Sequence, residues 1–171
     1  MIEYLIYSED PSEHWCHLNI KDQNVLDLGC GRWSLPDEKN STPYYFLNNG
    51  ANKVVGVDVL KDEIDFYNKI NNNNKLSFIQ AKLGEFDTLV VARKLINDNQ
   101  ITSIKCDIEG AELFFLALNK EDYKTINSIA IEYHGLWIKD LLLSHFNNNG
   151  FTLSVHGILN PEFGVIFLNK D

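Results

Sequence analysis

A chain of 171 residues and 19.6 kDa has the size of one domain, and its 44% hydrophobic content is enough to fill one core. The formal net charge of −9 at pH 7 would repel a phosphate backbone, so nucleic acid is a disfavoured partner. Three cysteines without a Cys-x-x-Cys pair favour reduced thiols and a cytoplasmic location over a disulfide framework. The sequence has no 18-residue apolar run and no signal-peptide pattern, so we expect no membrane segment.

From Asn24 onward, short apolar runs alternate with segments of helical spacing, a pattern typical of βα units that build a parallel sheet. The predicted parallel strands span residues 25–28, 53–57, 76–80, 101–106 and 128–133. The predicted helices include residues 44–48, 62–70, 88–96 and 110–118, followed by an amphipathic helix from about Ile138 to just before Gly150.

The last part of the chain has a different pattern. Residues 151–155 and 165–168 are predicted as strands, and the turn-like segment 157–164 between them is too short for a helical crossover, so the two strands should be antiparallel. The sequence therefore predicts an α/β fold: a Rossmann-like, mostly parallel sheet of seven strands with helices on both faces and a C-terminal antiparallel hairpin. We expect a single domain over residues 1–171, with 1–23 as an N-terminal extension and 24–171 as the core.

A glycine turn follows the first predicted strand. In Asp27-Leu28-Gly29-Cys30-Gly31, two glycines let a ligand approach bare backbone, although a tight turn without a ligand is the structural alternative. A dinucleotide fingerprint would need a third glycine at Ser34, which argues against a nicotinamide oxidoreductase.

The second predicted strand ends at Asp58, where a carboxylate can accept hydrogen bonds from both hydroxyls of a ribose. A solvated loop aspartate is the alternative. Gly31 and Asp58 lie 27 positions apart, more than the roughly 20 usual for such motifs, so residues Arg32 to Thr42 are predicted to be an insertion that covers a bound cofactor.

Together, Val25-Leu-Asp-Leu-Gly-Cys-Gly31 and Val54-Val-Gly-Val-Asp58 resemble the cofactor motifs of class I S-adenosyl-L-methionine (SAM) methyltransferases. The resemblance implies SAM as cofactor and S-adenosyl-L-homocysteine (SAH) as product. The superfamily often has an adenine-binding aspartate after the third strand; this chain has Lys82 there, so backbone near Leu83 is the expected adenine contact. The implied cofactor-binding residues are Asp27, Gly29, Cys30, Gly31, Asp58, Val59, Lys82, Leu83 and Asp107.

The segment Ile104-Lys-Cys-Asp-Ile-Glu-Gly-Ala-Glu112 is similar to the Lys-x-Asp-x-Glu-Gly-x-Glu signature of the FkbM-like methyltransferases. This resemblance implies O-methylation of a small-molecule or glycan acceptor. Because Asp107 and Glu109 follow a predicted strand, they should face the ligand crevice and position the cofactor or the acceptor. A helix-capping role is the alternative for Glu109, and the favoured one for Glu112.

Glu132 and His134 end the fifth predicted strand on the same side, while Tyr133 points away, so the two side chains can act as a pair. We predict that this pair contains the general base, with a structural role as the alternative for each residue. The histidines show no metal-ligand spacing, so no metal is expected. His14 could at most line the mouth of the cofactor site.

Two functions fit these patterns. The glycine turn and Asp58 suit either a SAM-dependent methyltransferase or a non-catalytic SAM- or nucleoside-binding module in a regulatory or scaffold role. The candidate catalytic residues favour the enzyme: His134, Glu132, Asp107 and Glu109. Nothing in the sequence indicates the oligomeric state.

Overall fold

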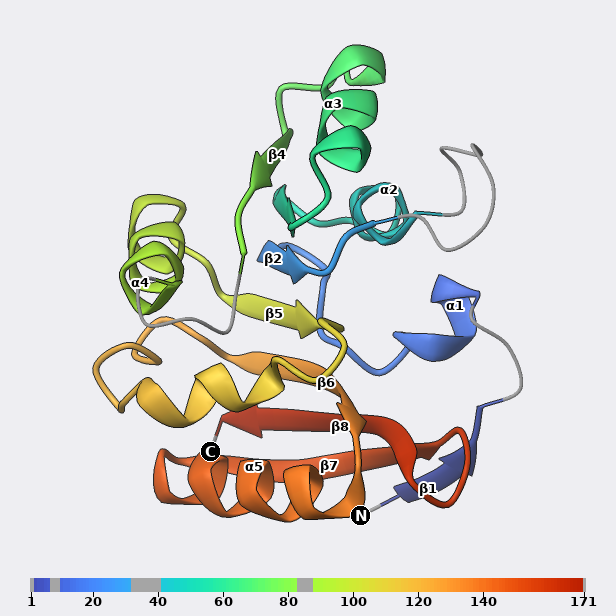
Figure 1. Ribbon diagram of the computed structural model, residues 1–171, viewed down its shortest axis with the longest axis vertical. Coiled ribbons are helices and arrows are strands. Elements are labelled where there is room, and N and C mark those ends of the chain that lie inside the picture. The colour runs from blue at the N-terminus through green and yellow to red at the C-terminus, as the bar shows by residue number, and fades with distance from the viewer. Residues whose placement is uncertain (1, 7–9, 32–40, 83–87, 171) are drawn as a thin grey trace.

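The computed structural model describes residues 2–6, 10–31, 41–82 and 88–170. Figure 1 shows a twisted sheet with helices on both sides. In chain order the elements are β1 (Ile2–Leu5), α1 (Pro11–His14), β2 (Asn24–Leu28), α2 (Thr42–Asn48), β3 (Lys53–Asp58), α3 (Lys61–Ile70), β4 (Leu76–Gln80), α4 (Thr88–Asp98), β5 (Ser103–Cys106), the 3₁₀ helix η2 (Glu112–Ala117), β6 (Ser128–His134), α5 (Leu136–Asn148), β7 (Phe151–Ile158) and β8 (Phe163–Lys170).

Within the described residues, the strands form one eight-stranded sheet in the order β1-β7-β8-β6-β5-β2-β3-β4. Strands β2 to β6 run parallel, and β8 runs antiparallel to both β6 and β7. The prediction of a mostly parallel sheet with a C-terminal antiparallel hairpin is thus confirmed. The chain leaves β2 for β3 and β4 and returns to β5 on the other side of β2. This reversal places a topological switch point between β2 and β5, where sheets of this kind bind ligands.

The predicted number of strands was too low, because β1 was not foreseen. This four-residue strand belongs to the predicted N-terminal extension, yet it pairs in parallel with β7, with Ile2 opposite Val155. Its mostly exposed residues give no clear alternating pattern. The hairpin strands were also predicted too short: β7 reaches Ile158 and β8 begins at Phe163, so half of the predicted turn 157–164 belongs to the strands.

The predicted helix over residues 110–118 is a 3₁₀ helix over Glu112–Ala117. Glu109 and Gly110 have left-handed backbone angles, φ 46° and 85°, which prevent a helix from starting directly after β5. The fully buried Phe115 then anchors the short helix to the core.

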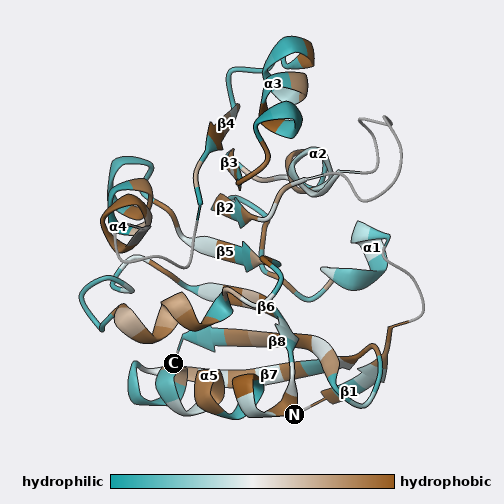
Figure 2. Cartoon of the chain, viewed as in Figure 1, coloured by the Kyte–Doolittle hydropathy of each residue, from teal (hydrophilic) through white to brown (hydrophobic). Residues whose placement is uncertain are grey.

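The core forms two layers because β2, β3 and β5 are buried on both faces. One layer joins strand residues such as Leu26 and Ile104 to apolar side chains of α4, η2 and α5. The other joins residues such as Val25 and Val54 to Trp15 and to apolar side chains of α2 and α3. In Figure 2, α3, α4 and α5 each carry both hydrophobic and hydrophilic segments, as expected for helices that pack on a sheet with one side.

Among the described residues, no helix combines the length and apolar character needed to cross a membrane.

Candidate functional site

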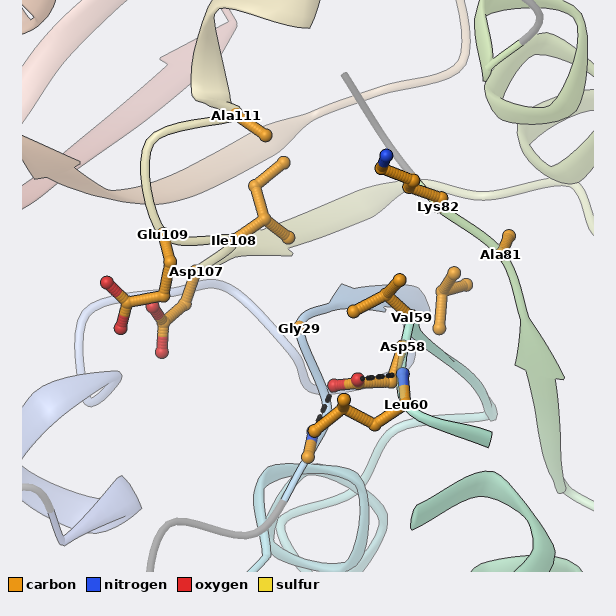
Figure 3. Close-up of a pocket in the computed structure, with 12 residues that line it drawn as sticks. Gly29, Asp58, Val59, Leu60, Ala81, Lys82, Asp107, Ile108, Glu109 and Ala111 are labelled. Atoms are coloured by element: carbon orange, nitrogen blue, oxygen red, sulfur yellow. Dashed lines mark hydrogen bonds between the residues drawn. The ribbon is translucent and has the colours of Figure 1, made fainter. Parts of the chain in front are cut away.

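A pocket of about 520 Å³ lies at the carboxyl ends of β2, β3, β4 and β5, beside the switch point (Figure 3). This volume is typical of small-molecule sites, which occupy roughly 300 to 1,000 Å³. The lining residues come from the end of β3 and from the loops that follow the four strands: Gly29, Gly31, Val57, Asp58, Val59, Leu60, Ala81, Lys82, Asp107, Ile108, Glu109 and Ala111.

The glycine turn after β2 fits tightly between its neighbours. Gly29 has φ +74°, and a Cβ added there would lie 1.6 Å from the backbone oxygen of Asp107. At Gly31, an added Cβ would lie 2.8 Å from Oδ2 of Asp58. Gly29 is therefore required for the turn to lie against the Asp107 backbone, whereas a side chain at position 31 would displace the Asp58 carboxylate.

Gly29→Ala is expected to destabilise the protein by about 1 to 3 kcal/mol more than Gly150→Ala. Both glycines have positive φ, but an added Cβ at Gly150 meets no atom within 4 Å. Gly150→Ala therefore costs only the free energy of placing alanine at a positive φ, whereas Gly29→Ala adds a clash with the Asp107 backbone. Urea unfolding of both variants measures the difference, and equal losses of stability would contradict the tight turn.

Asp58 organises the rim of the pocket. Its Oδ2 accepts a hydrogen bond from the backbone N–H of Gly31 at 2.8 Å, and its Oδ1 accepts one from Leu60 at 2.8 Å (Figure 3). Val59 and Leu60 next to it are 50% and 58% exposed, which is high for apolar side chains. The rim therefore offers a carboxylate beside an apolar surface.

A buried ion pair lies beneath the glycine turn. Lys105 on β5 is opposite Asp27 on β2; its Nζ is 3.1 Å from Oδ1 of Asp27 and donates to the backbone oxygen of Gly29 at 2.7 Å. Burial alone would lower the pKa of Lys105, but Asp27 and Asp107 raise it above its usual value, so the ammonium is charged. Burial raises the pKa of Asp27, against the opposing effect of Lys105.

Asp27 and Cys30, both predicted to bind cofactor, have side chains that are fully buried. Asp27 holds Lys105 and accepts a hydrogen bond from the Thr42 hydroxyl. Cys30 packs in the core against Gly56, and burial raises the pKa of its thiol. Neither side chain lines the pocket; the predicted Leu83 and most of the predicted covering insertion, residues 32–40, lie outside the described residues.

A second group of polar side chains borders the pocket at the end of β6. Nε2 of His134 lies 3.3 Å from Oε2 of Glu109 and 3.7 Å from Oε1 of Glu132, and Nδ1 is hydrogen-bonded to Glu112. Tyr133 points to the other side of the sheet. The predicted pairing of Glu132 and His134 on one side of the strand is therefore confirmed.

The charges in this group shift each other's protonation. The hydrogen bond with Glu112 raises the pKa of His134 to about 9, and Glu109 and Glu132 act in the same direction. Burial raises the pKa of Asp107 to about 6, against the opposing effect of Lys105. In this arrangement His134 is an imidazolium at neutral pH, with carboxylates on both ring nitrogens.

The N-terminal segment reaches into this group through His14. This residue ends the short helix α1, is 3% exposed, and places Nε2 2.8 Å from Oε2 of Glu132. His14 was predicted to carry no chemistry, but it holds the predicted catalytic carboxylate of Glu132.

Asp107, Glu132 and His134 converge so closely that one ligand atom from each lies within 4.8 Å of the others. Sequence spacing did not indicate such a set of metal-ligating side chains, because Asp107 follows β5 while the other two belong to β6. The expectation of no metal rested on histidine spacing, which does not detect side chains brought together from two strands.

Two further residues of the site were missed or assigned another role. Lys105 gave a signal, a lysine inside an otherwise apolar strand, which indicates a buried partner. Glu112 was assigned to helix capping, but it is fully buried and holds His134 from across the site.

No family model matches the chain. Over 117 residues it is 31% identical to the mitochondrial ubiquinone biosynthesis O-methyltransferase of Dictyostelium discoideum. The matched segment covers 63% of this chain and 32% of that protein. The chain thus spans about a third of the length of the curated relative it matches.

Solved structures resemble the chain over nearly its whole length. A protein of the NADB-Rossmann superfamily from Streptococcus agalactiae has a TM-score of 0.66 at 12% identity, over 96% of this chain and 68% of that one. TrmK of M. capricolum, solved with SAH, has a TM-score of 0.61 at 15% identity, over 97% of this chain and 70% of that one. With the sheet order, these likenesses show that the chain has a Rossmann-like α/β fold.

Proposed function

We propose that the chain is a SAM-dependent methyltransferase that methylates a hydroxyl oxygen of a small-molecule or carbohydrate-like acceptor. The observation that carries the proposal is the direct contact between two sites: Asp107 and Glu109 line the pocket, and Glu109 also lies 3.3 Å from His134. A cofactor pocket and a group of proton-transferring side chains thus share one edge of the sheet.

The pocket residues suit SAM. Gly29 and Gly31 line the pocket without side chains, the Asp58 carboxylate can accept hydrogen bonds from ribose hydroxyls, and exposed Val59 and Leu60 offer an apolar surface for adenine. The negative charge at Asp107 suits the cationic methionine end.

When bound, SAM supplies an electrophilic methyl group. The residues of this chain would act on the acceptor, which lies at the end of β6 in our proposal. Nδ1 of His134 is hydrogen-bonded to Glu112 and Nε2 lies 3.7 Å from Glu132, while His14 is hydrogen-bonded to Glu132 at 2.8 Å and holds it in place. Glu132 is then the group of the pair that accepts the hydroxyl proton.

We also infer an FkbM-like relationship, supported by what each signature residue does in this chain. Lys105 holds the glycine turn, Asp107 and Glu109 border the pocket, and Glu112 holds His134. The O-methyltransferase with which the chain shares 31% identity supports an oxygen acceptor. The net charge of −9 argues against a nucleic-acid acceptor, and the free thiols of Cys16, Cys30 and Cys106 suit the reducing cytoplasm.

A non-catalytic SAM-binding module is the second candidate, since the pocket alone would serve it. The buried partners of Glu132 and His134 favour the enzyme, because holding two polar side chains at a pocket edge serves catalysis better than binding. SAH binding without methyl transfer to any of a broad set of hydroxyl compounds would favour the module.

Calorimetry with SAH and NAD tests the cofactor assignment. We expect SAH to bind more tightly than NAD, and Asp58→Ala to weaken SAH about 10- to 150-fold, because two charge-assisted hydrogen bonds contribute roughly 1.5 to 3 kcal/mol. Asp98→Ala removes the same charge from an exposed position on α4 and should leave the dissociation constant unchanged. Stronger binding of NAD, or an unaltered SAH affinity in Asp58→Ala, would overturn the assignment.

A further inference from the structure

The side chains of Asp107, Glu132 and His134 form a donor set at one point. Their ligand atoms lie within 4.8 Å of one another, and they come from the carboxyl ends of the adjacent parallel strands β5 and β6. One imidazole and two carboxylates are ligands that divalent transition metals accept.

Each of the three side chains has its own buried partner. Glu132 is bound by His14 at 2.8 Å, His134 by Glu112, and Asp107 lies 3.8 Å from Lys105. These three partners are 3%, 0% and 1% exposed, respectively. Metal-ligating side chains in proteins are commonly oriented by such outer contacts.

The group is also short of positive charge. Glu112 is fully buried, and its Oε2 has no hydrogen-bond partner among the residues that the structure describes. Around His134, the carboxylates of Asp107 and Glu132 are largely shielded from solvent and that of Glu109 is exposed, while Lys105 is shared between Asp27 and Asp107. Carboxylates held close together in a shielded place repel one another, so this point favours a bound cation.

We propose that Asp107, Glu132 and His134 bind one divalent transition-metal cation, such as Mn²⁺ or Zn²⁺, at the edge of the pocket. Because Glu112 occupies Nδ1 of His134, the ligand atom is Nε2, and the cation takes the place of the Nε2 proton. Three protein ligands leave coordination positions open. An acceptor oxygen bound there would lose its proton more readily, a role that rests on the proposed function, whereas cation binding itself does not.

Metal-free protein, prepared with a chelator, is titrated with Mn²⁺ while electron paramagnetic resonance follows the free ion. We expect one site per chain and displacement of Mn²⁺ by Zn²⁺. Glu132→Gln and the outer-contact variant His14→Gln should each weaken Mn²⁺ binding about 10- to 100-fold. Asp98→Asn, at an exposed acidic side chain on α4, should leave Mn²⁺ affinity unchanged.

SAH calorimetry on the same samples separates this proposal from the proposed function. Retained SAH affinity in Glu132→Gln shows that the variant is folded, so its weaker Mn²⁺ binding then reports a lost ligand. No saturable Mn²⁺ binding by wild-type protein, or equal Mn²⁺ affinity in wild type and Glu132→Gln, overturns the cation site. Mn²⁺ binding without SAH binding upholds the cation site and contradicts the proposed function.

Discussion

Lys105→Met is expected to lower the free energy of unfolding by about 3 to 5 kcal/mol, because it leaves the fully buried Asp27 without its cation. The ammonium also donates to the backbone of Gly29, so the glycine turn loses a support. Chemical denaturation followed by circular dichroism measures the loss.

The matched control is Lys94→Met, which removes an equal charge from an exposed ion pair with Asp98 and should cost less than about 1 kcal/mol. Adding Asp27→Asn to Lys105→Met removes the buried negative charge and should restore part of the lost stability. If the double variant is no more stable than Lys105→Met alone, the unpaired buried charge of Asp27 is not the cause of the stability lost in Lys105→Met.

His134→Ala is expected to lower kcat about 10² to 10⁴-fold on a genuine acceptor, with SAH affinity changed little. Glu132→Gln should have a similar effect, because Glu132 is the proposed proton acceptor and the His134 ring lies 3.7 Å from it. Neither residue lines the pocket, which is why cofactor binding should survive. Transfer of a radiolabelled methyl group from SAM measures turnover.

His145→Ala is the control: this histidine lies on α5 and is hydrogen-bonded to Tyr123, away from the pocket. Its turnover should stay within about a factor of two of wild type. If both His134→Ala and Glu132→Gln keep near wild-type turnover, the base lies elsewhere, and Asp107 or Glu109 becomes the candidate.

Sequence patterns were sufficient for the central part of the fold. Strands β2 and β3 are buried on both faces and consist mostly of apolar residues, and α3 and α5 have apolar residues at helical spacing. Strand β1 was missed because its pairing with β7 depends on a partner about 150 positions away, which no local pattern encodes. The 3₁₀ geometry of η2 depends on the left-handed Glu109, which is unusual for a residue with a side chain.

The candidate site was foreseen where residues share a strand or a turn. The pocket is lined by the predicted Gly29, Gly31, Asp58 and Asp107, which follow from the rule that ligands bind at the carboxyl ends of the strands. Strand alternation was enough to predict that Glu132 and His134 share one side of β6. Contacts between distant segments were not foreseen. His14 meets Glu132 across 118 positions, and Glu112 reaches His134 from a different element, so only the folded chain reveals them.

The pairing of β1 with β7 also sets an order of events during synthesis. The pairing of Ile2 with Val155 can form only after Val155 has been synthesised, and the contact of His14 with Glu132 only after Glu132 has been synthesised. At 5 to 20 residues per second, the first strand stays without its partner for roughly 8 to 30 seconds, while β2 to β5 can already pair. Long-range pairings of this kind slow folding. The wall of the site that α1 provides is therefore among the last parts to assemble on the ribosome, after the cofactor pocket has taken shape.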